Sequence, residues 1–199
     1  MIHGRKEYKE YIRYEADIYS STKLGGGGGK FLIYNIVKPP AYAFLLSLRR
    51  LEFHYNTPGL LHKLLLPFAY YRYLKASQKA GISISKNSCE KGLTLYHFGS
   101  IVVNAATRIG RNCCIMNNVN IGANAGSAKA PKIGNNVYIG PGAVIYGEIE
   151  IADGCYIGAN AVVNKSFLEP NSVIAGVPAK VIKHDSENWW QKNKMTREL

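Results

Sequence analysis

A six-residue repeat in the C-terminal half of the chain restricts its fold more than any other feature. Stepping by six from Val103 to Val163 meets an aliphatic side chain at every position except Ser127. The register resumes in phase after an interruption over 123–132, as expected of a loop that replaces or bulges from one repeat. This first column comprises Val103, Ile109, Ile115, Ile121, Ser127, Ile133, Ile139, Ile145, Ile151, Ile157 and Val163.

A second column, of mostly small or β-branched residues, lies four residues after the first, and turn-forming Gly and Asn residues separate the two. An α-helix, with roughly 3.6 residues per turn, cannot keep one face apolar at a step of six. The pattern therefore predicts a parallel β-helix of short strands and tight turns, three strands to a coil, with the aliphatic column inside. The second column comprises Thr107, Cys113, Val119, Ala125, Val137, Ala143, Ile149, Cys155 and Ala161.

The residues before the repeat have helical patterns. Thr57 and Pro58 resemble the cap and first residue of a helix that runs to about residue 79, where Gly81 would stop it. Pro67 is expected to kink this helix. Two further helices are expected, over 5–20 and 41–53.

These patterns divide the chain into three expected parts: an α-helical N-terminal region over 1–80, the β-helix over 81–182, and a tail over 183–199. The tail should contain a short C-terminal helix that includes Trp189 and Trp190. The run of five glycines from Gly25 to Gly29 should form a surface loop.

The chain is basic, with a formal net charge of +12, and residues 1–80 hold 13 Lys and Arg against 5 Asp and Glu. A basic surface attracts anions such as cofactor phosphates, a membrane face or nucleic acid. Nucleic acid is disfavoured because no recognised binding module accompanies the charge. Over 31–80, basic residues alternate with aromatic ones. That segment either lies on a membrane surface, or caps the coil and packs against a neighbouring subunit.

Four cysteines, Cys89, Cys113, Cys114 and Cys155, lack C-x-x-C spacing, and no cleavable signal precedes them. Reduced thiols of this kind indicate a cytoplasmic protein, either free or peripheral at the inner membrane face. Cys113 and Cys155 fall in the inward column and are expected in the core. Apolar stretches such as Leu64 to Tyr71 are far shorter than the roughly 18 residues of a membrane-spanning helix.

The stretch from Gly81 to Lys183, with His97-Phe98-Gly99 at its start and Ala175-Gly176-Val177-Pro178-Ala179-Lys180 near its end, resembles the hexapeptide-repeat acyltransferases. The closest resemblance is to serine acetyltransferases, in the branch associated with surface-polysaccharide synthesis. The resemblance implies a left-handed coil and a homotrimer with its sites at subunit boundaries. It also implies acetyl-CoA as co-substrate, no required metal, and acetyl transfer in a ternary complex.

The resemblance assigns roles to particular residues. His97, six residues before Val103 and so in phase with the aliphatic column, would be the general base. An imidazole with an unperturbed pKa of about 6.5 suits removal of a hydroxyl proton near neutral pH. Lys180 would contact cofactor phosphate, and three turn residues would contact the cofactor through their backbone: Ala123, Pro141 and Ala159. Two residues are assigned to the acceptor site: Tyr96 and Lys129.

The acceptor is where the chain departs from the serine-specific enzymes. They have an aspartate directly before the catalytic histidine, where this chain has Tyr96, and a second aspartate that has no counterpart over Ser83 to Lys86. Their Arg-His-Pro-Lys-Ile is here Lys129-Ala130-Pro131-Lys132-Ile133. Since recognition of an amino acid needs charged partners, we expect the hydroxyl of a sugar in a polysaccharide or glycolipid precursor as acceptor. Glu90, Ser83 or a backbone carbonyl would then orient His97.

Three other functions compete with this one. The first is a true serine O-acetyltransferase of cysteine biosynthesis. The second is a carbonic anhydrase on the same coil, which needs three histidines around zinc, whereas His97 is the only histidine within 81–182. The third is a non-catalytic assembly subunit that keeps the coil without its activity.

Overall fold

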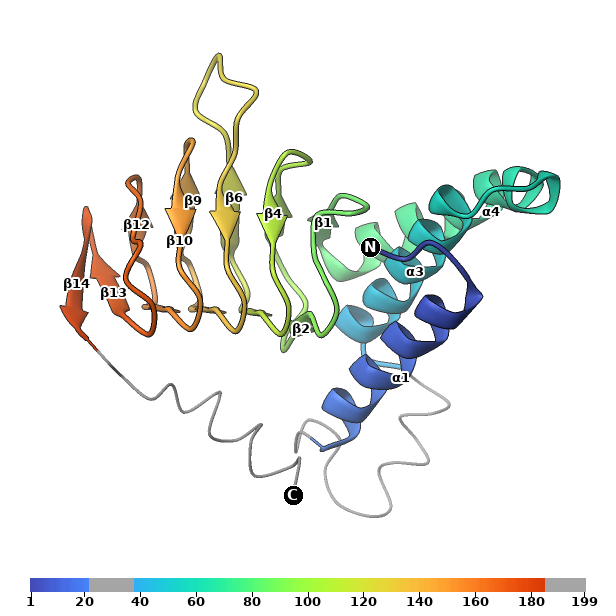
Figure 1. Ribbon diagram of the computed structural model, residues 1–199, viewed down its shortest axis with the longest axis horizontal. Coiled ribbons are helices and arrows are strands. Elements are labelled where there is room, and N and C mark those ends of the chain that lie inside the picture. Colours follow the sequence, from blue (N-terminus) through green and yellow to red (C-terminus); the bar gives the residue numbers. More distant parts are fainter. Residues whose placement is uncertain (22–37, 185–199) are drawn as a thin grey trace.

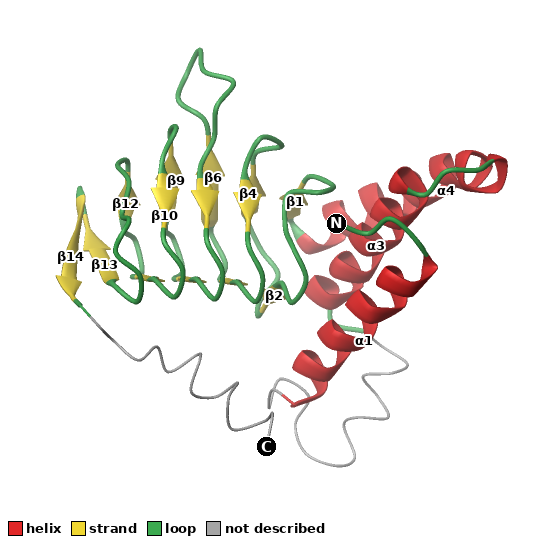
Figure 2. Ribbon diagram, viewed as in Figure 1, coloured by secondary structure: helices red, strands yellow, loops and turns green. Residues whose placement is uncertain are grey.

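The computed structural model describes residues 1–21 and 38–184. Within this part of the chain, three helices lie against one end of a coil of short strands, and a hairpin closes the other end (Figure 1). Figure 2 shows that helix and strand are segregated along the chain rather than mixed. The expected glycine loop and C-terminal helix, including Trp189 and Trp190, lie outside the described residues.

The coil has three walls, each a sheet whose neighbouring strands come from successive rungs and pair in parallel. Sheet A contains β1 (Ile82–Ile84), β3 (Ile101–Val103), β6 (Val119–Gly122), β9 (Val144–Tyr146) and β12 (Val162–Val163). Sheet B contains β4 (Arg108–Ile109), β7 (Lys132–Ile133) and β10 (Glu150–Ile151). Sheet C contains β2 (Thr94–Leu95), β5 (Cys114–Ile115), β8 (Tyr138–Ile139), β11 (Tyr156–Ile157), β13 (Val173–Gly176) and β14 (Ala179–Lys183). Only β14 runs antiparallel to its neighbour among these described strands.

Both predicted columns form the core of the coil. Every aliphatic member of the first column is buried, and so is every member of the second except Ala125. Ala125 and Ser127 are exposed because they lie in the loop between β6 and β7, which leaves the coil. This loop holds the predicted interruption of the repeat and extends farther from the coil than the other turns (Figure 1).

Asparagines make several of the tight turns. Five of them occupy the left-handed region of backbone space with φ between 56° and 59°: Asn112, Asn118, Asn136, Asn160 and Asn171. Asn tolerates this conformation better than other non-glycine residues, because its short polar side chain bonds to nearby backbone. The residues between the apolar columns therefore set where each rung turns.

The helices are α1 (Arg5–Ser21), α3 (Pro40–Asn56) and α4 (Leu60–Ala80), which confirms the three predicted helices. The start of the third was predicted two residues early. Thr57 is extended, and its N–H donates to the Phe53 carbonyl at 3.1 Å, so it closes α3 instead of capping α4. Gly81 ends α4 in the left-handed conformation, φ 68°, as predicted from its position.

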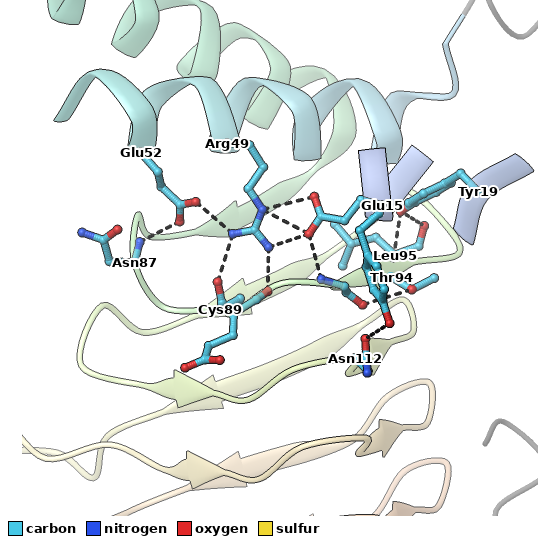
Figure 3. A network of polar contacts seen from close by, with 12 residues as sticks. Glu15, Tyr19, Arg49, Glu52, Asn87, Cys89, Thr94, Leu95 and Asn112 are labelled. Atoms are coloured by element: carbon cyan, nitrogen blue, oxygen red, sulfur yellow. Dashed lines mark hydrogen bonds and ion pairs between the residues drawn. The ribbon is translucent and has the colours of Figure 1, made fainter. Parts of the chain in front are cut away.

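A buried cation joins the helices to the first rung (Figure 3). The Arg49 guanidinium on α3 pairs with the carboxylate of Glu15 on α1 at 2.7 Å and with that of Glu52 at 2.9 Å. It also donates to the carbonyls of Cys89 at 2.9 Å and Glu90 at 2.7 Å, just before β2. Arg49 belongs to the basic segment of the sequence, yet it contributes nothing to the surface, because its side chain is fully buried.

The two carboxylates around Arg49 are themselves held by backbone N–H groups. Gly92 N–H donates to Glu15, and Asn87 N–H donates to Glu52 at 2.8 Å. Burial by itself lowers the pKa of Arg49, but the two carboxylates outweigh it and raise that pKa above the ordinary value. The cluster therefore links α1, α3 and the first rung through charged groups that have hydrogen-bond partners.

Replacing Arg49 with Met should lower the free energy of unfolding by about 3–5 kcal/mol, because two buried carboxylates and two carbonyls would lose their partner. Urea unfolding at fixed protein concentration measures the loss. Arg50→Met is the matched control, since Arg50 is the exposed neighbour on the same helix. Equal losses in the two variants would refute the role given to the buried cluster.

Candidate active site

The turns from sheet C to sheet A stack on one another at one edge of the coil, here called the C–A edge. The strands before them pair in register, Leu95 with Ile115, Ile115 with Ile139, Ile139 with Ile157 and Ile157 with Ile174. The residues two positions further on therefore occupy equivalent places in successive turns. They are His97, Asn117, Pro141 and Ala159; the matching position in the last rung is Gly176, the final residue of β13.

Backbone hydrogen bonds hold these turns together. Gly142 N–H donates to the Asn117 carbonyl at 3.0 Å, and Asn160 N–H donates to the Pro141 carbonyl at 2.9 Å. A Cβ at Gly140 would lie 2.8 Å from the Ala159 nitrogen, so these turns stack too closely for a side chain there. Three positions chosen from sequence, His97, Pro141 and Ala159, thus share one edge.

His97 lies in the first turn of the C–A edge, and its side chain is exposed. This corrects its expected place in the aliphatic register. Leu95 pairs with Ile115, and Val103 pairs with Ile121. Val103 lies eight residues after Leu95, whereas Ile121 lies only six residues after Ile115. The two extra residues make this turn longer than the next, so the imidazole stands outside the coil instead of in the core.

The His97 turn is held on both sides. After it, Gly99 N–H donates to the Ala80 carbonyl at 2.8 Å, which joins the turn to the last residue of α4. Before it, the Tyr19 hydroxyl bonds to both the N–H and the carbonyl of Leu95, at 2.9 Å each, and joins β2 to α1. Half-buried Tyr96 packs against a small cluster on the outer face of sheet C that contains Cys114 and Tyr138. Helices thus fix the backbone around an exposed imidazole.

The hairpin that contains Lys180, the residue predicted to contact cofactor phosphate, closes the last rung. Ala175 pairs with Lys180 and Gly176 with Ala179 across β13 and β14, and Lys180 is exposed. In sheet C the order runs β2-β5-β8-β11-β13-β14. Lys180 is therefore five strand spacings, about 24 Å, from the strand that leads to His97.

Ala123 and Lys129 lie at a different edge, in the loop that connects sheet A to sheet B. Ala123 is half-buried there, and the Lys129 ammonium pairs with the Glu148 carboxylate at 2.6 Å. Within one chain the fold therefore does not bring these two residues together with His97.

None of the proposed orienting groups bonds to His97. Glu90 pairs with Arg111 at 3.0 Å, and Ser83 lies on the exposed side of β1, opposite Val102 of β3. In the described part of the chain, no hydrogen bond or ion pair to the His97 ring is formed. The sequence analysis did not predict Asn117, which also lies on the C–A edge. Asn117 precedes Pro141 by 24 residues, a whole multiple of the six-residue repeat, and this spacing could have identified it.

The four cysteines are free and buried. Burial raises the pKa of the Cys89 and Cys155 thiols, which disfavours the reactive thiolate. Cys113 and Cys155 lie in the core as predicted. The cysteine side chains thus suit a packing role and offer no accessible nucleophile.

A groove of about 320 Å³ lies on the sheet B side, between Met1, Ser88, Arg108 and Lys132. Glu90 lines it, but none of the residues assigned to the base, the cofactor or the acceptor does. Among the described residues there is also no group of three His, Cys, Asp or Glu side chains placed to hold a metal ion. The zinc site that a carbonic anhydrase would need is thus missing from this part of the chain.

Comparison with known proteins identifies the repeat and the fold. Residues 130–165 match the bacterial transferase hexapeptide model, which describes six repeats. Serine acetyltransferase from Brucella abortus strain S19 superposes with a TM-score of 0.75 at 24% identity, over 92% of this chain and 72% of that one. The chain carries hexapeptide repeats and has the fold of the serine acetyltransferases. This hexapeptide-repeat protein matches no curated protein sequence.

Two ligand-bound structures share the fold with this hexapeptide-repeat protein. The Brucella abortus enzyme in complex with coenzyme A has a TM-score of 0.72 at 24% identity, covering 92% of this chain and 70% of that one. The Neisseria gonorrhoeae serine acetyltransferase in complex with serine has a TM-score of 0.69 at 23% identity, covering 89% and 70%. The predicted fold class, a left-handed parallel β-helix with an N-terminal helical region, is confirmed.

Proposed function

We propose that this protein is an O-acetyltransferase that moves the acetyl group of acetyl-CoA to a hydroxyl, with His97 as general base. One observation carries the proposal: an exposed imidazole stands on a turn whose backbone is bonded to helices on both sides, at the start of an edge of stacked turns that ends at the Ala175–Lys180 hairpin. The hexapeptide transferase match and the serine acetyltransferase fold support the same class of reaction.

The chemistry follows from one imidazole. His97 removes the hydroxyl proton as the acceptor oxygen attacks the thioester carbonyl, and a tetrahedral oxyanion forms. When this intermediate collapses, the C–S bond breaks, the ester remains on the acceptor, and His97 returns the proton to the CoA sulfur. Backbone N–H groups of the turns are suited to stabilise the oxyanion. No covalent enzyme intermediate is needed, in keeping with the buried cysteines.

The C–A edge suits an elongated cofactor. With the thioester beside His97, the chain of acetyl-CoA would pass the backbone of Pro141 and Ala159 and reach Lys180, whose ammonium would pair with a phosphate. The coenzyme A complex of the Brucella abortus enzyme, which has the same fold, supports acetyl-CoA as co-substrate. No metal enters this scheme.

Ala123 and Lys129 join this site only if a second copy of the chain supplies them, because they lie at another edge of their own coil. We therefore propose a homotrimer in which the C–A edge of one subunit faces the loop edge of the next. In that cleft Ala123 would contact the cofactor through its backbone, while Lys129 and Tyr96 would contact the acceptor.

Of the two acceptors considered, serine is better supported than a sugar hydroxyl. The structures compared above are serine acetyltransferases, and one is a complex with serine. One observation favours a sugar of a polysaccharide or glycolipid precursor. Within the described residues, no carboxylate bonds to His97. An amino-acid acceptor would need such a carboxylate near the base as a partner for its ammonium group. Serine is thus the first acceptor to test and a sugar the second.

We place the protein in the cytoplasm because its free thiols fit a reducing compartment.

His97→Ala should lower the rate of acetyl transfer by at least about a hundredfold, the usual scale for loss of a general base. Release of the CoA thiol measures the rate, and urea unfolding checks that the variant is folded. His3→Ala is the control, since His3 is an exposed histidine outside the site. A folded His97→Ala enzyme with an unchanged rate would remove His97 from the mechanism.

Free serine should accelerate CoA release from acetyl-CoA, and the product should be an O-acetyl ester. Parallel reactions with sugar nucleotides and oligosaccharides test the second acceptor. A stimulation by sugars alone would transfer the assignment to a sugar O-acetyltransferase. Absence of stimulation by every acceptor would favour the non-catalytic assembly subunit.

The shared cleft predicts that two defective subunits can restore a site. Ala123→Trp should block the cleft from the loop side, and His97→Ala should remove the base, so each homotrimer should be inactive. Co-expressed mixed trimers should regain activity, because a subunit with intact His97 then faces one with intact Ala123. Light scattering should give about three times the chain mass of 22.0 kDa. A fully active monomer would exclude the shared site.

A further inference from the structure

Helix α4 carries an exposed apolar surface on the side that faces away from the rest of the protein. Five large apolar side chains in its first twelve residues are between 57% and 74% exposed: Leu60, Leu61, Leu64, Phe68 and Tyr71. Monomeric soluble proteins rarely leave so many neighbouring apolar groups in water, and such patches mark contact sites. We call these five residues the α4 apolar face.

Helical geometry separates this face from the packed side of α4. Ala69, Tyr73 and Ala80 are buried against the protein. Leu60, Leu64, Phe68 and Tyr71 follow one another at steps of four, four and three, which places them on one stripe of a helix. The side of α4 that packs against the protein already has its own apolar residues, so folding of a single chain does not require the exposed stripe to be apolar.

The charges around the α4 apolar face all have one sign. Residues 60–80 contain Lys63, Arg72, Lys75 and Lys79 and no Asp or Glu. The Arg72 guanidinium lies over the Phe68 ring and the Lys75 ammonium over the Tyr71 ring, each at 5.7 Å from the centroid. These cations therefore lie beside the exposed aromatic rings, as in helices that bind at the boundary of lipid headgroups and acyl chains.

A second copy of α4 is a poor partner for this face. Pairing two such helices would bring eight like charges together with no carboxylate from either helix, which is unfavourable. An anionic lipid surface satisfies both features, because headgroups neutralise the cations while the apolar groups enter the acyl boundary. None of the described helices is long and apolar enough to cross a bilayer.

We propose that the α4 apolar face docks the protein on the surface of an anionic phospholipid membrane. The helix would lie in the plane of the interface, with Leu60, Leu64 and Phe68 toward the acyl chains and the basic side chains among the phosphates. In Figure 1, α4 lies at the opposite end of the molecule from the hairpin. The surface does not depend on the proposed acetyl transfer.

Co-sedimentation of the full chain with vesicles tests the proposal. Vesicles of phosphatidylcholine mixed with phosphatidylglycerol should bind the protein, and vesicles of phosphatidylcholine alone should bind it much less. Added salt should weaken the binding, because it screens the headgroup attraction. Leu64→Glu should reduce the affinity at least about tenfold, because a leucine that would enter the lipid is replaced by a charge that the anionic surface repels.

Leu168→Glu is the matched control: Leu168 is 69% exposed and Leu64 is 68% exposed, but Leu168 lies on the coil. It should bind vesicles like the unaltered protein. The proposal would be overturned if the unaltered protein did not bind the mixed vesicles, or if both variants lost the same amount of vesicle binding. It would also be overturned if the protein formed an assembly larger than a trimer and Leu64→Glu reduced the size of that assembly, because a second copy of the chain would then cover the α4 apolar face. Acetyl transfer to a soluble acceptor without vesicles should be equal in both variants, which separates this test from that of the proposed function.

Discussion

Parallel hydrogen bonding between successive rungs is the constraint on which the rest of this structure depends. Most strands have only two or three residues, and such short strands are not stable alone. Each gains its partners from the rung before and the rung after, so the register of one rung passes to the next. Stacked strands impose stacked turns, and this is why His97, Pro141 and Ala159 share an edge although they are far apart in the sequence.

A stack of rungs has two open ends, and each exposes unpaired strand edges that invite association. The antiparallel hairpin of β13 and β14 closes one end. At the other end α3 and α4 cover the first rung, and Arg49 ties α1 and α3 to the carbonyls of Cys89 and Glu90. The helical region thus does more than cap the coil, because the last residue of α4 bonds directly to the turn that carries His97.

Position along the stack gives the two ends of the candidate site different properties. The His97 turn is longer than the next one, stands out from the coil and is supported by two helices. Lys180 lies on the closing hairpin, at the far end of the same sheet. A rigid scaffold between them sets their separation, which favours a ligand that is long and extended. The α4 apolar face adds a surface that is separate from this edge and lies toward the start of α4, whereas the last residue of α4 bonds to the first turn.

The sequence by itself determined the coil, its two buried columns, the three helices and Gly81 as the end of α4. Periodicity and turn chemistry act between near neighbours and are therefore readable without a structure. The resemblance to serine acetyltransferases supplied His97 as a candidate.

Tertiary structure alone decided three matters. Counting back from Val103 placed His97 in the core register, but two extra residues put it outside. Ala123 and Pro141 look alike as turn residues, yet pairing between rungs puts them on different edges. Arg49 reads as a surface cation, yet a carboxylate from Glu15, 34 residues away, makes its burial stable. Each of these depends on contacts between residues distant in the chain, which local pattern does not encode.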